Sequence, residues 1–363
     1  MKKGTVYLAA LLLLCLCFGA RAETTVTVTF TGDVTLGGVE TGRGSADSFD
    51  GFADLEGYDY FFRNMKPLFD SDDLTLVNLE GPLTDSRSQE NTKKNIRFRG
   101  RTDFVNILKA GGIEACAVSN NHMMDFGRQG YNKTIETLEN AGILYCGNDY
   151  SFVFEKDGTK TAFFALNGGY LTRANMKAVG QRIARLREEG VGAVVCCFHA
   201  GQEYIPKRRD WDQERYAKTA VEEWGADLVV MHHPHVLQGI DVIRGRYVFY
   251  SLGNFCFGGA AVVRNQEGHS EVRTLETAVL QADLVFDGAG KLQAVEGRIY
   301  PCYTSSSAKK AGDVNDYQPK PVTGEEALGV LERIQADTSF DLGGLDETEG
   351  FLRLPRLAPE KEE

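Results

Sequence analysis

Histidine is rare in this chain, and most of its copies are clustered. Of the six histidines in 363 residues, all but His269 fall in three short polar segments. The clustered histidines are His122, His199, His232, His233 and His235. A single histidine is more often structural than a ligand, but several in segments that meet predict a metal site, because imidazole is the commonest metal ligand in proteins. Geometry rather than affinity then chooses among zinc, manganese and iron.

Two acids stand in comparable places. Asp33 follows a glycine at the end of an apolar run, and Glu80 stands before a Gly-Pro pair. The second position is a poor one for a surface acid and a good one for a carboxylate that bridges metal ions. Both acids also have a plainer interpretation. Asp33 could cap a turn, and Glu80 could pair with a basic neighbour such as Arg97 or Arg99.

Two short spacings add to this set. Asn121 and His122 are adjacent in an irregular segment, so their side chains point in different directions and one can bind metal while the other faces substrate. His233 and His235 are separated only by a proline, which holds the segment extended. Each spacing alone is moderate evidence for a metal centre, and together with the acids they are strong evidence.

Strand-like runs end directly before these polar residues. The runs are Thr25 to Phe30, Leu74 to Val77, Ala115 to Val118, Ala193 to Phe198 and Asp227 to Met231. Helix-like stretches end at or beside glycines, and they are Thr102 to Ala110, Tyr131 to Asn140, Val179 to Glu189 and Trp211 to Trp224. Alternating strands and helices indicate an α/β fold with a largely parallel sheet. Because loops at the carboxyl ends of parallel strands share one edge, we expect all five polar clusters to meet there.

The last third of the chain has a different pattern. Two strand-like stretches, Glu276 to Phe286 and Leu292 to Tyr300, flank an Asp-Gly turn, and we expect them to be antiparallel and to complete a second sheet. Residues Thr323 to Ala336 are expected to form an amphipathic helix. Its predicted apolar face consists of Leu328, Leu331 and Ile334. The acidic end, Pro359 to Glu363, is expected to be a solvated tail.

The overall charge excludes one class of partner. The chain has 40 lysines and arginines against 51 acidic residues, which gives a formal net charge of −11. Nucleic-acid binding depends on clustered positive charge, so no nucleic-acid partner is expected. The content of 42% hydrophobic and 25% charged residues is typical of a folded globular protein.

Residues 1–22 have the pattern of a secretory signal. Two lysines precede an apolar run from Val6 to Phe18, which ends at Ala20-Arg21-Ala22, a site suited to signal peptidase. An uncleaved anchor is an alternative, and lipidation is a weaker one because neither cysteine in the run follows a small residue. Removal of this segment changes the net charge to −14, since it takes two lysines, one arginine and no acid. We expect an extracellular or cell-surface protein.

The six other cysteines are sparse and mostly lie in strand-like apolar runs. An even number in an exported chain permits disulfides, but we expect buried free thiols. The sequence contains no CxxC pair, which excludes a structural zinc ribbon.

Six motifs in order resemble a known family. They are Phe30 to Val34, Asn78 to Thr84, Ser119 to His122 with Asp125 to Gly127, His199 to Tyr204, His232 to Val236, and Tyr250 to Phe255. In these motifs the chain resembles the capsule-synthesis CapA proteins, a family associated with bacterial poly-γ-glutamate synthesis and part of the calcineurin-like metallophosphoesterase superfamily. The resemblance implies a four-layer α/β/β/α sandwich with a two-metal centre between the loops of the two sheets. It divides the chain into a signal at 1–22, a CapA-type domain at 23–322, and a C-terminal helix and acidic tail at 323–363.

The resemblance also implies residue roles. The implied metal ligands are Asp33, Glu80, Asn121, His199, His233 and His235. The first metal takes Asp33, Glu80 and His235, and the second takes Glu80, Asn121, His199 and His233. His122 is implied to face the substrate as general acid, with His232 and Asp125 behind the ligands. Arg97, Arg99 and Asn254 are candidate contacts to an anionic substrate, although a solvated surface is an equal alternative for the two arginines.

Two positions depart from the superfamily pattern. Thr35 stands where most of these enzymes have a histidine, and Glu80 stands where an aspartate is usual. The first metal therefore lacks an imidazole. We expect one or two divalent ions, Mn, Zn or Fe, with one tight and one weak position.

The implied function is an exported component of capsule or poly-γ-glutamate synthesis. One hypothesis is a metal-dependent hydrolase of an anionic polymer or phosphoester, which would approach through the basic stretch from Lys93 to Arg101. A second is a non-catalytic component that binds the polymer or membrane synthase partners and uses metal structurally. A third, weaker one is a general phosphodiesterase or nucleotidase.

Overall fold

The computed structural model describes residues 22–207, 211–258, 274–307 and 313–360. The signal expected at 1–22 lies outside the described residues except for its last alanine, and so do His269 and the last three residues of the expected tail. Within the described ranges no helix combines the length and the apolar character that a membrane crossing requires.

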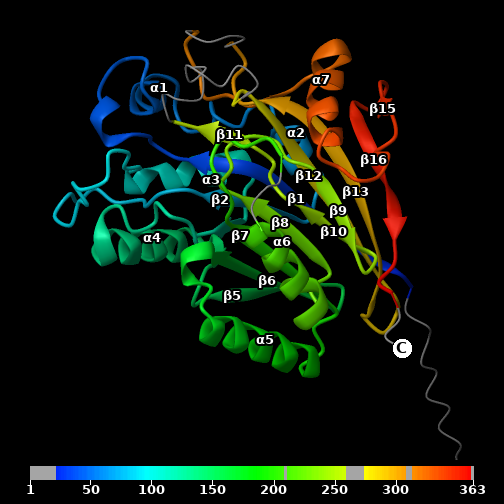
Figure 1. Ribbon diagram of the computed structural model, residues 1–363. Coiled ribbons are helices and arrows are strands. Elements are labelled where there is room, and N and C mark those ends of the chain that lie inside the picture. The colour runs from blue at the N-terminus through cyan, green and yellow to red at the C-terminus, as the bar shows by residue number, and fades with distance from the viewer. Residues whose placement is uncertain (1–21, 208–210, 259–273, 308–312, 361–363) are drawn as a thin grey trace, which may run out of the picture.

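The described strands form two sheets that face each other (Figure 1). The larger has ten strands, in the order β15-β16-β13-β12-β1-β2-β3-β4, with β11 paired to β1 and β14 paired to β13. Their bounds are β1 Thr24–Thr35, β2 Leu74–Leu79, β3 Ala115–Ala117, β4 Leu144–Cys146, β11 Asn254–Phe257, β12 Glu276–Phe286, β13 Leu292–Tyr303, β14 Lys320–Pro321, β15 Leu345–Asp346 and β16 Phe351–Leu357. The smaller has six, in the order β5-β6-β7-β8-β10-β9. Their bounds are β5 Ser151–Lys156, β6 Thr159–Asn167, β7 Ala193–His199, β8 Leu228–His232, β9 Ile240–Ile243 and β10 Arg246–Phe249.

Helices cover the outer faces of both sheets. They are α1 Phe49–Glu56, α2 Lys66–Phe69, α3 Val105–Gly111, α4 Gly127–Ala141, α5 Arg173–Glu188 and α6 Trp211–Lys218. Helix α7, Gly324–Gln335, instead packs its buried residues into the core between the sheets. One core lies between the sheets, a second under α1 to α4, and a third under α5 and α6. The predicted four-layer α/β/β/α sandwich is confirmed by these three cores.

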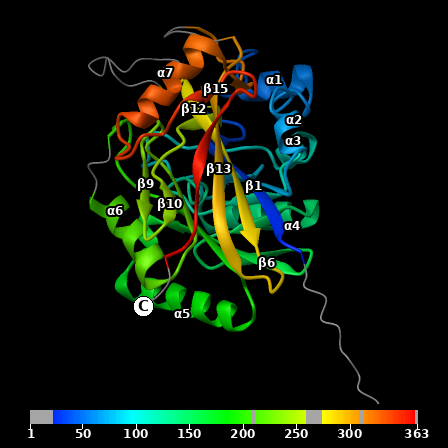
Figure 2. The same ribbon diagram turned by 90° about the vertical axis from the view of Figure 1, so that its right-hand side faces the viewer.

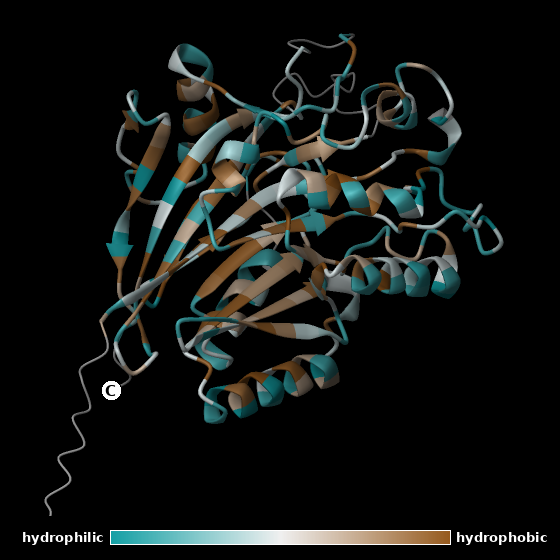
Figure 3. Cartoon of the chain, turned by 180° about the vertical axis from the view of Figure 1, so that it is seen from behind, coloured by the Kyte–Doolittle hydropathy of each residue, from teal (hydrophilic) through white to brown (hydrophobic). Residues whose placement is uncertain are grey.

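The strands of the smaller sheet show why the sequence folds in layers. In β7, Val195 and Cys197 enter the core between the sheets, whereas Cys196 and Phe198 enter the core under α5 and α6. Successive side chains of a strand point to opposite faces, so a strand covered on both sides must be apolar throughout. Figure 3 shows this as almost unbroken brown strands beside a helix, α5, that is banded with teal.

The pairing of the late strands corrects one expectation. β12 and β13 are antiparallel, as predicted, but they belong to the larger sheet, because β12 pairs along its length with β1 from Thr24 to Phe30. The five polar clusters therefore come from two sheets and not from one. Periodicity shows that a strand exists, and it does not show which distant strand pairs with it.

The C-terminal region differs from a helix followed by a tail. Helix α7 forms, but its buried residues are Ala327, Val330, Leu331 and Ile334. Leu328, predicted on the apolar face, is 44% exposed. Beyond the helix, β15 and β16 extend the larger sheet, with β16 beside β13 (Figure 2). Leu352 and Leu354 enter the core at alternate positions of β16, so a strand of the larger sheet lies between the helix and the tail expected at Pro359 to Glu363.

The cysteines follow the prediction. All six in the described residues, Cys116, Cys146, Cys196, Cys197, Cys256 and Cys302, are buried and free. Burial raises the pKa of the Cys197 thiol to about 12, so it stays protonated and unreactive at neutral pH.

Candidate metal centre

The predicted ligands meet where the carboxyl ends of strands from both sheets come together. Asp33 lies near the end of β1, Glu80 follows β2, His199 ends β7 and His232 ends β8. A bond from the backbone N–H of His233 to Asp33 Oδ2, at 3.3 Å, connects the two sheets directly. The edge predicted from strand-end chemistry therefore exists, although two sheets supply it.

Asp33 is fixed from both neighbouring strands. Register places it beside Asn78 of β2 and Asn254 of β11, and Asn78 Nδ2 donates to Asp33 Oδ1 at 2.8 Å. A Cβ on Gly32 would lie 2.3 Å from the Gly253 carbonyl oxygen, so only glycine permits this close approach of β1 to the segment before β11. Burial alone would raise the pKa of Asp33, but the hydrogen bond and charge of His235 outweigh it and hold that pKa well below its ordinary value.

Glu80 carries the clearest sign of a cation site. Its side chain is completely buried, and neither carboxylate oxygen has a hydrogen-bond partner among the described residues. Three imidazole Nε2 atoms surround its Oε1, those of His235 at 3.7 Å, His199 at 3.8 Å and His122 at 3.9 Å. Burial raises the pKa of Glu80 well above its ordinary value.

That arrangement fits a divalent ion. A buried carboxylate without partners is costly, and the structure places ring nitrogens around it just beyond hydrogen-bond distance. Nitrogen and oxygen ligands each bind zinc at about 2.0–2.2 Å, which leaves such a gap between the ligands themselves. The carboxylate and imidazole donor set suits Mn, Zn or Fe equally.

His235 is oriented as a ligand. Its Nδ1 lies 2.9 Å from Asn254 Oδ1 and 3.2 Å from Asp33 Oδ2. Since both oxygens are acceptors, Nδ1 carries the proton and Nε2 is left facing Glu80. Burial opposes a charge on this ring, but the carboxylates of Glu80 and Asp33 outweigh it and raise the pKa of His235 to about 10.

His199 and His232 are deeply buried. His199 Nε2 lies 2.9 Å from Asn121 Oδ1, so the amide predicted as a ligand does reach this cluster. Burial and the neighbouring imidazoles lower the pKa of His199 well below its ordinary value. His232 Nδ1 lies 3.5 Å from Asp33 Oδ1, and neither of its ring nitrogens has a hydrogen-bond partner in the described part of the chain.

His122 is held by its own set of contacts. Its Nδ1 lies 2.6 Å from Asp125 Oδ2, and its ring packs 4.2 Å from the ring of Phe98, measured between centroids. Asp125 is completely buried and also accepts bonds from Lys94 Nζ at 2.6 Å and from the Phe98 N–H at 2.9 Å. Burial lowers the pKa of His122, although the bond to Asp125 works in the opposite direction. Nε2 therefore faces Glu80, while the far side of the ring is fixed.

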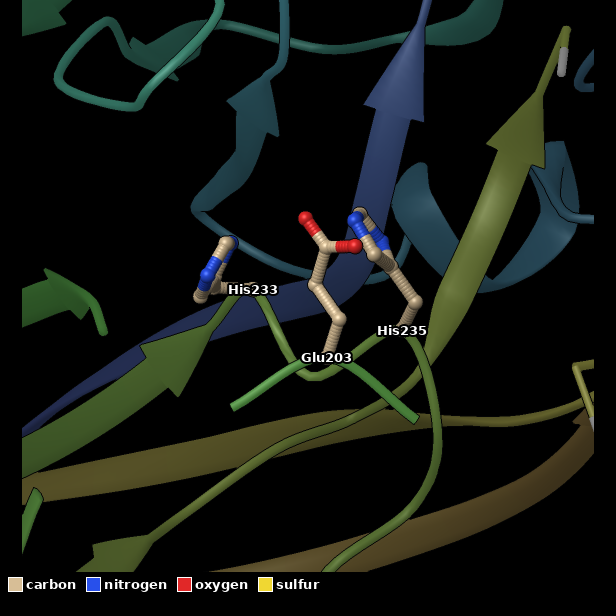
Figure 4. Close-up of side chains that lie close together, drawn as sticks. All are labelled: Glu203, His233 and His235. Carbon is tan, nitrogen blue, oxygen red and sulfur yellow. The ribbon is translucent and has the colours of Figure 1, made fainter. Parts of the chain in front are cut away.

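Among the described residues, the ligand atoms form two close groups. Two groups have ligand atoms that lie within 4.8 Å of one another, Asp33 with Glu80 and His199, and Glu203 with His233 and His235 (Figure 4). Glu203 was not predicted as a site residue. It lies four residues after His199 in a loop that turns at Gly201, where φ is +118°, and no regular periodicity extends into such a loop. Asn78 was also missed, although it is two residues before Glu80 in a strand and therefore shares a face with it.

Three predicted substrate contacts have other partners. Arg97 Nε donates to Glu90 at 2.8 Å, and Arg99 Nε and one of its terminal nitrogens donate to Glu40 at 2.8 and 3.1 Å. Both arginines are therefore largely buried in these ion pairs. They form neither a solvated surface nor an ion pair with Glu80. Asn254 points at His235.

The basic stretch from Lys93 to Arg101 is also compensated. Lys94 pairs with Asp125, and Arg101 pairs with Asp54 and Asp103. With the arginines at 97 and 99 also paired, an anionic substrate approaching this stretch meets little uncompensated positive charge.

A pocket of about 210 Å³ opens beside His199 and His233. Its other polar walls come from Asn121, Asn167 and Asp212. It is smaller than the roughly 300–1,000 Å³ of a pocket for a whole small ligand. It therefore fits part of a substrate next to the centre.

The chain was compared with known protein families. Residues 27–259, well over half of the chain, match the family described as bacterial capsule synthesis protein PGA_cap. The chain belongs to the PGA_cap family. The resemblance to CapA proteins that its motifs indicate is thereby confirmed.

Two relatives of this PGA_cap chain are named as CapA proteins. "Capsule biosynthesis protein CapA" of Bacillus anthracis is 29% identical over 308 residues, which are 78% of this chain and 68% of that protein. "PGA biosynthesis protein CapA" of Bacillus subtilis (strain 168) is 27% identical over 301 residues, 76% and 74% of the two chains. A crystal structure of a hypothetical protein from Thermus thermophilus aligns with a TM-score of 0.45 at 16% identity, covering 76% of this chain and 99% of that protein. That similarity is too weak to carry an argument.

The contact between Lys94 and Asp125 makes a testable prediction for this PGA_cap chain. Lys94→Ala removes the ion pair to a completely buried carboxylate and the bond from Nζ to the Asn121 carbonyl at 2.9 Å. We expect the free energy of unfolding to fall by about 1–3 kcal/mol, measured by urea denaturation. Lys93→Ala is the matched control, because Lys93 is exposed, and it should change stability by no more than about 0.5 kcal/mol. Equal effects of the two substitutions would contradict the assignment.

Proposed function

We propose that this PGA_cap chain is an exported, metal-dependent hydrolase that acts on an anionic capsule polymer or on a phosphoester. The observation that carries the proposal is Glu80, a completely buried carboxylate without hydrogen-bond partners among the described residues and with three imidazole nitrogens within 3.9 Å. A purely structural cluster of buried polar groups is expected to pair them with one another. A centre that binds cations instead leaves ligand atoms without hydrogen bonds, because the ions are their partners.

The site residues have distinct roles in this proposal. Asp33, Glu80, His199, His233 and His235 would hold the metal, with Asn121 beside His199. A bound divalent ion lowers the pKa of water toward neutrality and stabilises negative charge on the substrate. Asn78 and Asn254 would keep Asp33 and His235 in their orientations.

His122 would protonate the leaving group. Its Nδ1 is bound to Asp125, so only Nε2 faces the centre, and in the imidazolium form this nitrogen carries the proton that can pass to a departing oxygen or nitrogen. Because Asp125 is itself held by Lys94 and the Phe98 N–H, the ring cannot turn away.

The substrate class rests on the family and on the location. The printed names of the two CapA relatives refer to capsule and PGA biosynthesis, and the signal pattern at 1–22 supports export to where a capsule polymer lies. The chain is acidic, so a polyanion would be repelled at long range and must be bound by local contacts. The pocket beside His199 and His233, which would take a single polar group of the substrate, is such a place.

A second function is favoured by one observation. Thr35 stands where the superfamily usually has a histidine, and its hydroxyl accepts a bond from the Gly258 N–H at 2.5 Å. The side chain is thus used to hold β11, which would suit a non-catalytic component that binds the polymer or a membrane synthase and needs metal only for its structure.

The test is hydrolysis by purified protein. The protein is incubated with Mn²⁺ and either poly-γ-glutamate, followed by size-exclusion chromatography, or a nitrophenyl phosphodiester, followed by absorbance. We expect one of the two substrates to be cleaved and EDTA to stop the reaction. Binding of Mn²⁺ without cleavage of either substrate would contradict the hydrolase and favour the non-catalytic component.

A further inference from the structure

Glu203 lies at the outer side of the metal centre. It belongs to the loop that follows β7, and its side chain is exposed. Nevertheless one of its carboxylate oxygens lies within 4.8 Å of a ring nitrogen of His233 and of a ring nitrogen of His235. Figure 4 shows the carboxylate turned toward His235.

The loop that carries Glu203 is tied to the His-Pro-His segment. The Tyr204 N–H donates to the Pro234 carbonyl at 2.8 Å, one residue from each of the side chains concerned. Three non-glycine residues here have left-handed backbones, Tyr204 with φ +63°, His233 with φ +102° and His235 with φ +58°. Such conformations are unfavourable and persist only where the surrounding structure enforces them, and they concentrate at functional sites. The position of Glu203 is therefore built into the fold.

Two buried atoms point to a ligand at this place independently of Glu203. Glu80, 1% exposed, has no hydrogen-bond partner in the described ranges and faces His235 Nε2 at 3.7 Å. The Nδ1 atom of His233 is also buried and unpartnered there. Both residues carry atoms of the kind that bind metal ions, and His233 and His235 are the residues beside the Glu203 carboxylate.

The residues around Glu203 form a ligand set without any contribution from position 35. The side chain of Thr35 is bonded to the Gly258 N–H and supplies no imidazole to the centre. A set of two imidazoles and one glutamate is a sufficient protein ligand set for a catalytic zinc ion, and it leaves a coordination position open for water or substrate.

We propose that Glu203 is a metal ligand and that, with His233 and His235, it forms an outer metal position. The proposal rests on the metal dependence proposed above. The inner position, Asp33 with Glu80 and His199, is completely buried, whereas the outer one has an exposed carboxylate and a half-buried His233. The outer ion is therefore the weaker and faster-exchanging of the two. This division differs from the implied one, in which His235 belongs with Asp33 and Glu80, and His233 belongs with His199.

The experiment is a Mn²⁺ titration of metal-stripped protein by calorimetry, comparing wild type, Glu203→Gln and Glu155→Gln. Glu155 is an exposed acid on β5, a strand of the smaller sheet that carries none of the proposed ligands. Its substitution therefore controls for the change in charge. We expect two phases for wild type and the control. In Glu203→Gln the weaker phase should lose affinity by at least about tenfold while the tighter phase is unchanged.

Thermal denaturation of metal-free protein accompanies the titration. Because Glu203 is exposed, Glu203→Gln should have the same metal-free Tm as wild type. A lower metal-free Tm would mean that any loss of binding comes from misfolding, and it would overturn the proposal. Unchanged affinities in both phases would also overturn it and leave the proposed function intact. If wild type binds no Mn²⁺ at all, the proposed function itself fails, and this inference with it.

Discussion

Replacing His122 with alanine is expected to lower the rate of hydrolysis by about 10²–10⁴-fold, the usual contribution of a general acid. His122 is not one of the grouped ligand residues, and its Nδ1 is bound to Asp125 at 2.6 Å. The substitution should therefore remove a proton donor and leave the affinity for Mn²⁺ unchanged. Steady-state kinetics on the substrate that wild type cleaves, together with a calorimetric Mn²⁺ titration, measure both quantities.

The leaving group provides an internal control for the His122 substitution. A nitrophenolate departs readily without a proton, whereas an alkoxide or amide nitrogen does not, so a lost general acid should matter less for the nitrophenyl substrate. We expect the rate loss to be at least about tenfold smaller for that substrate than for one with a poor leaving group. Equal losses, or a loss of Mn²⁺ together with activity, would show that His122 acts as a ligand.

The strands and site residues that could be predicted are those whose positions depend on their neighbours in the sequence. β7 and β8 are covered on both faces and therefore read as continuous apolar runs. β7 ends in the proposed ligand His199, and β8 ends directly before the proposed ligand His233. The pair His233 and His235 and the buried Glu80 were visible for a similar reason, because their neighbours in sequence already restrict the backbone.

Partners that are distant in sequence were not predictable. Nothing near Arg99 indicates that Glu40, 59 residues away, will take its guanidinium, and nothing in β12 indicates β1 as its neighbour. Leu328 fits a helical apolar stripe, but the helix turns a neighbouring face, that of Ala327 and Val330, to the core. In each case the deciding contact is set by how the layers pack and not by the local pattern.

Glu80→Gln is expected to remove most of the stabilisation of this protein by metal. An ion at a hundredfold excess over its Kd stabilises a folded protein by about 2.7 kcal/mol, which raises the Tm of wild type. Gln keeps the size of the side chain but removes the negative charge that faces the Nε2 atoms of His199 and His235. Differential scanning fluorimetry with Mn²⁺ and with EDTA should therefore give two clearly different Tm values for wild type. The difference should be much smaller for the variant, in which only the outer position of Glu203, His233 and His235 remains.

The metal-free comparison makes the Glu80 prediction specific. Glu80 is buried without hydrogen bonds to the described residues, and its raised pKa reflects the cost of a charge there, so metal-free Glu80→Gln should be at least as stable as metal-free wild type. Glu40→Gln is the matched control, because the Glu40 side chain is 6% exposed and holds Arg99 away from the centre. That variant should lose about 3 kcal/mol of stability and keep the full Mn²⁺ response. If Glu80→Gln behaved like Glu40→Gln, Glu80 would be a structural acid, and the proposed metal centre would lose the residue on which it depends.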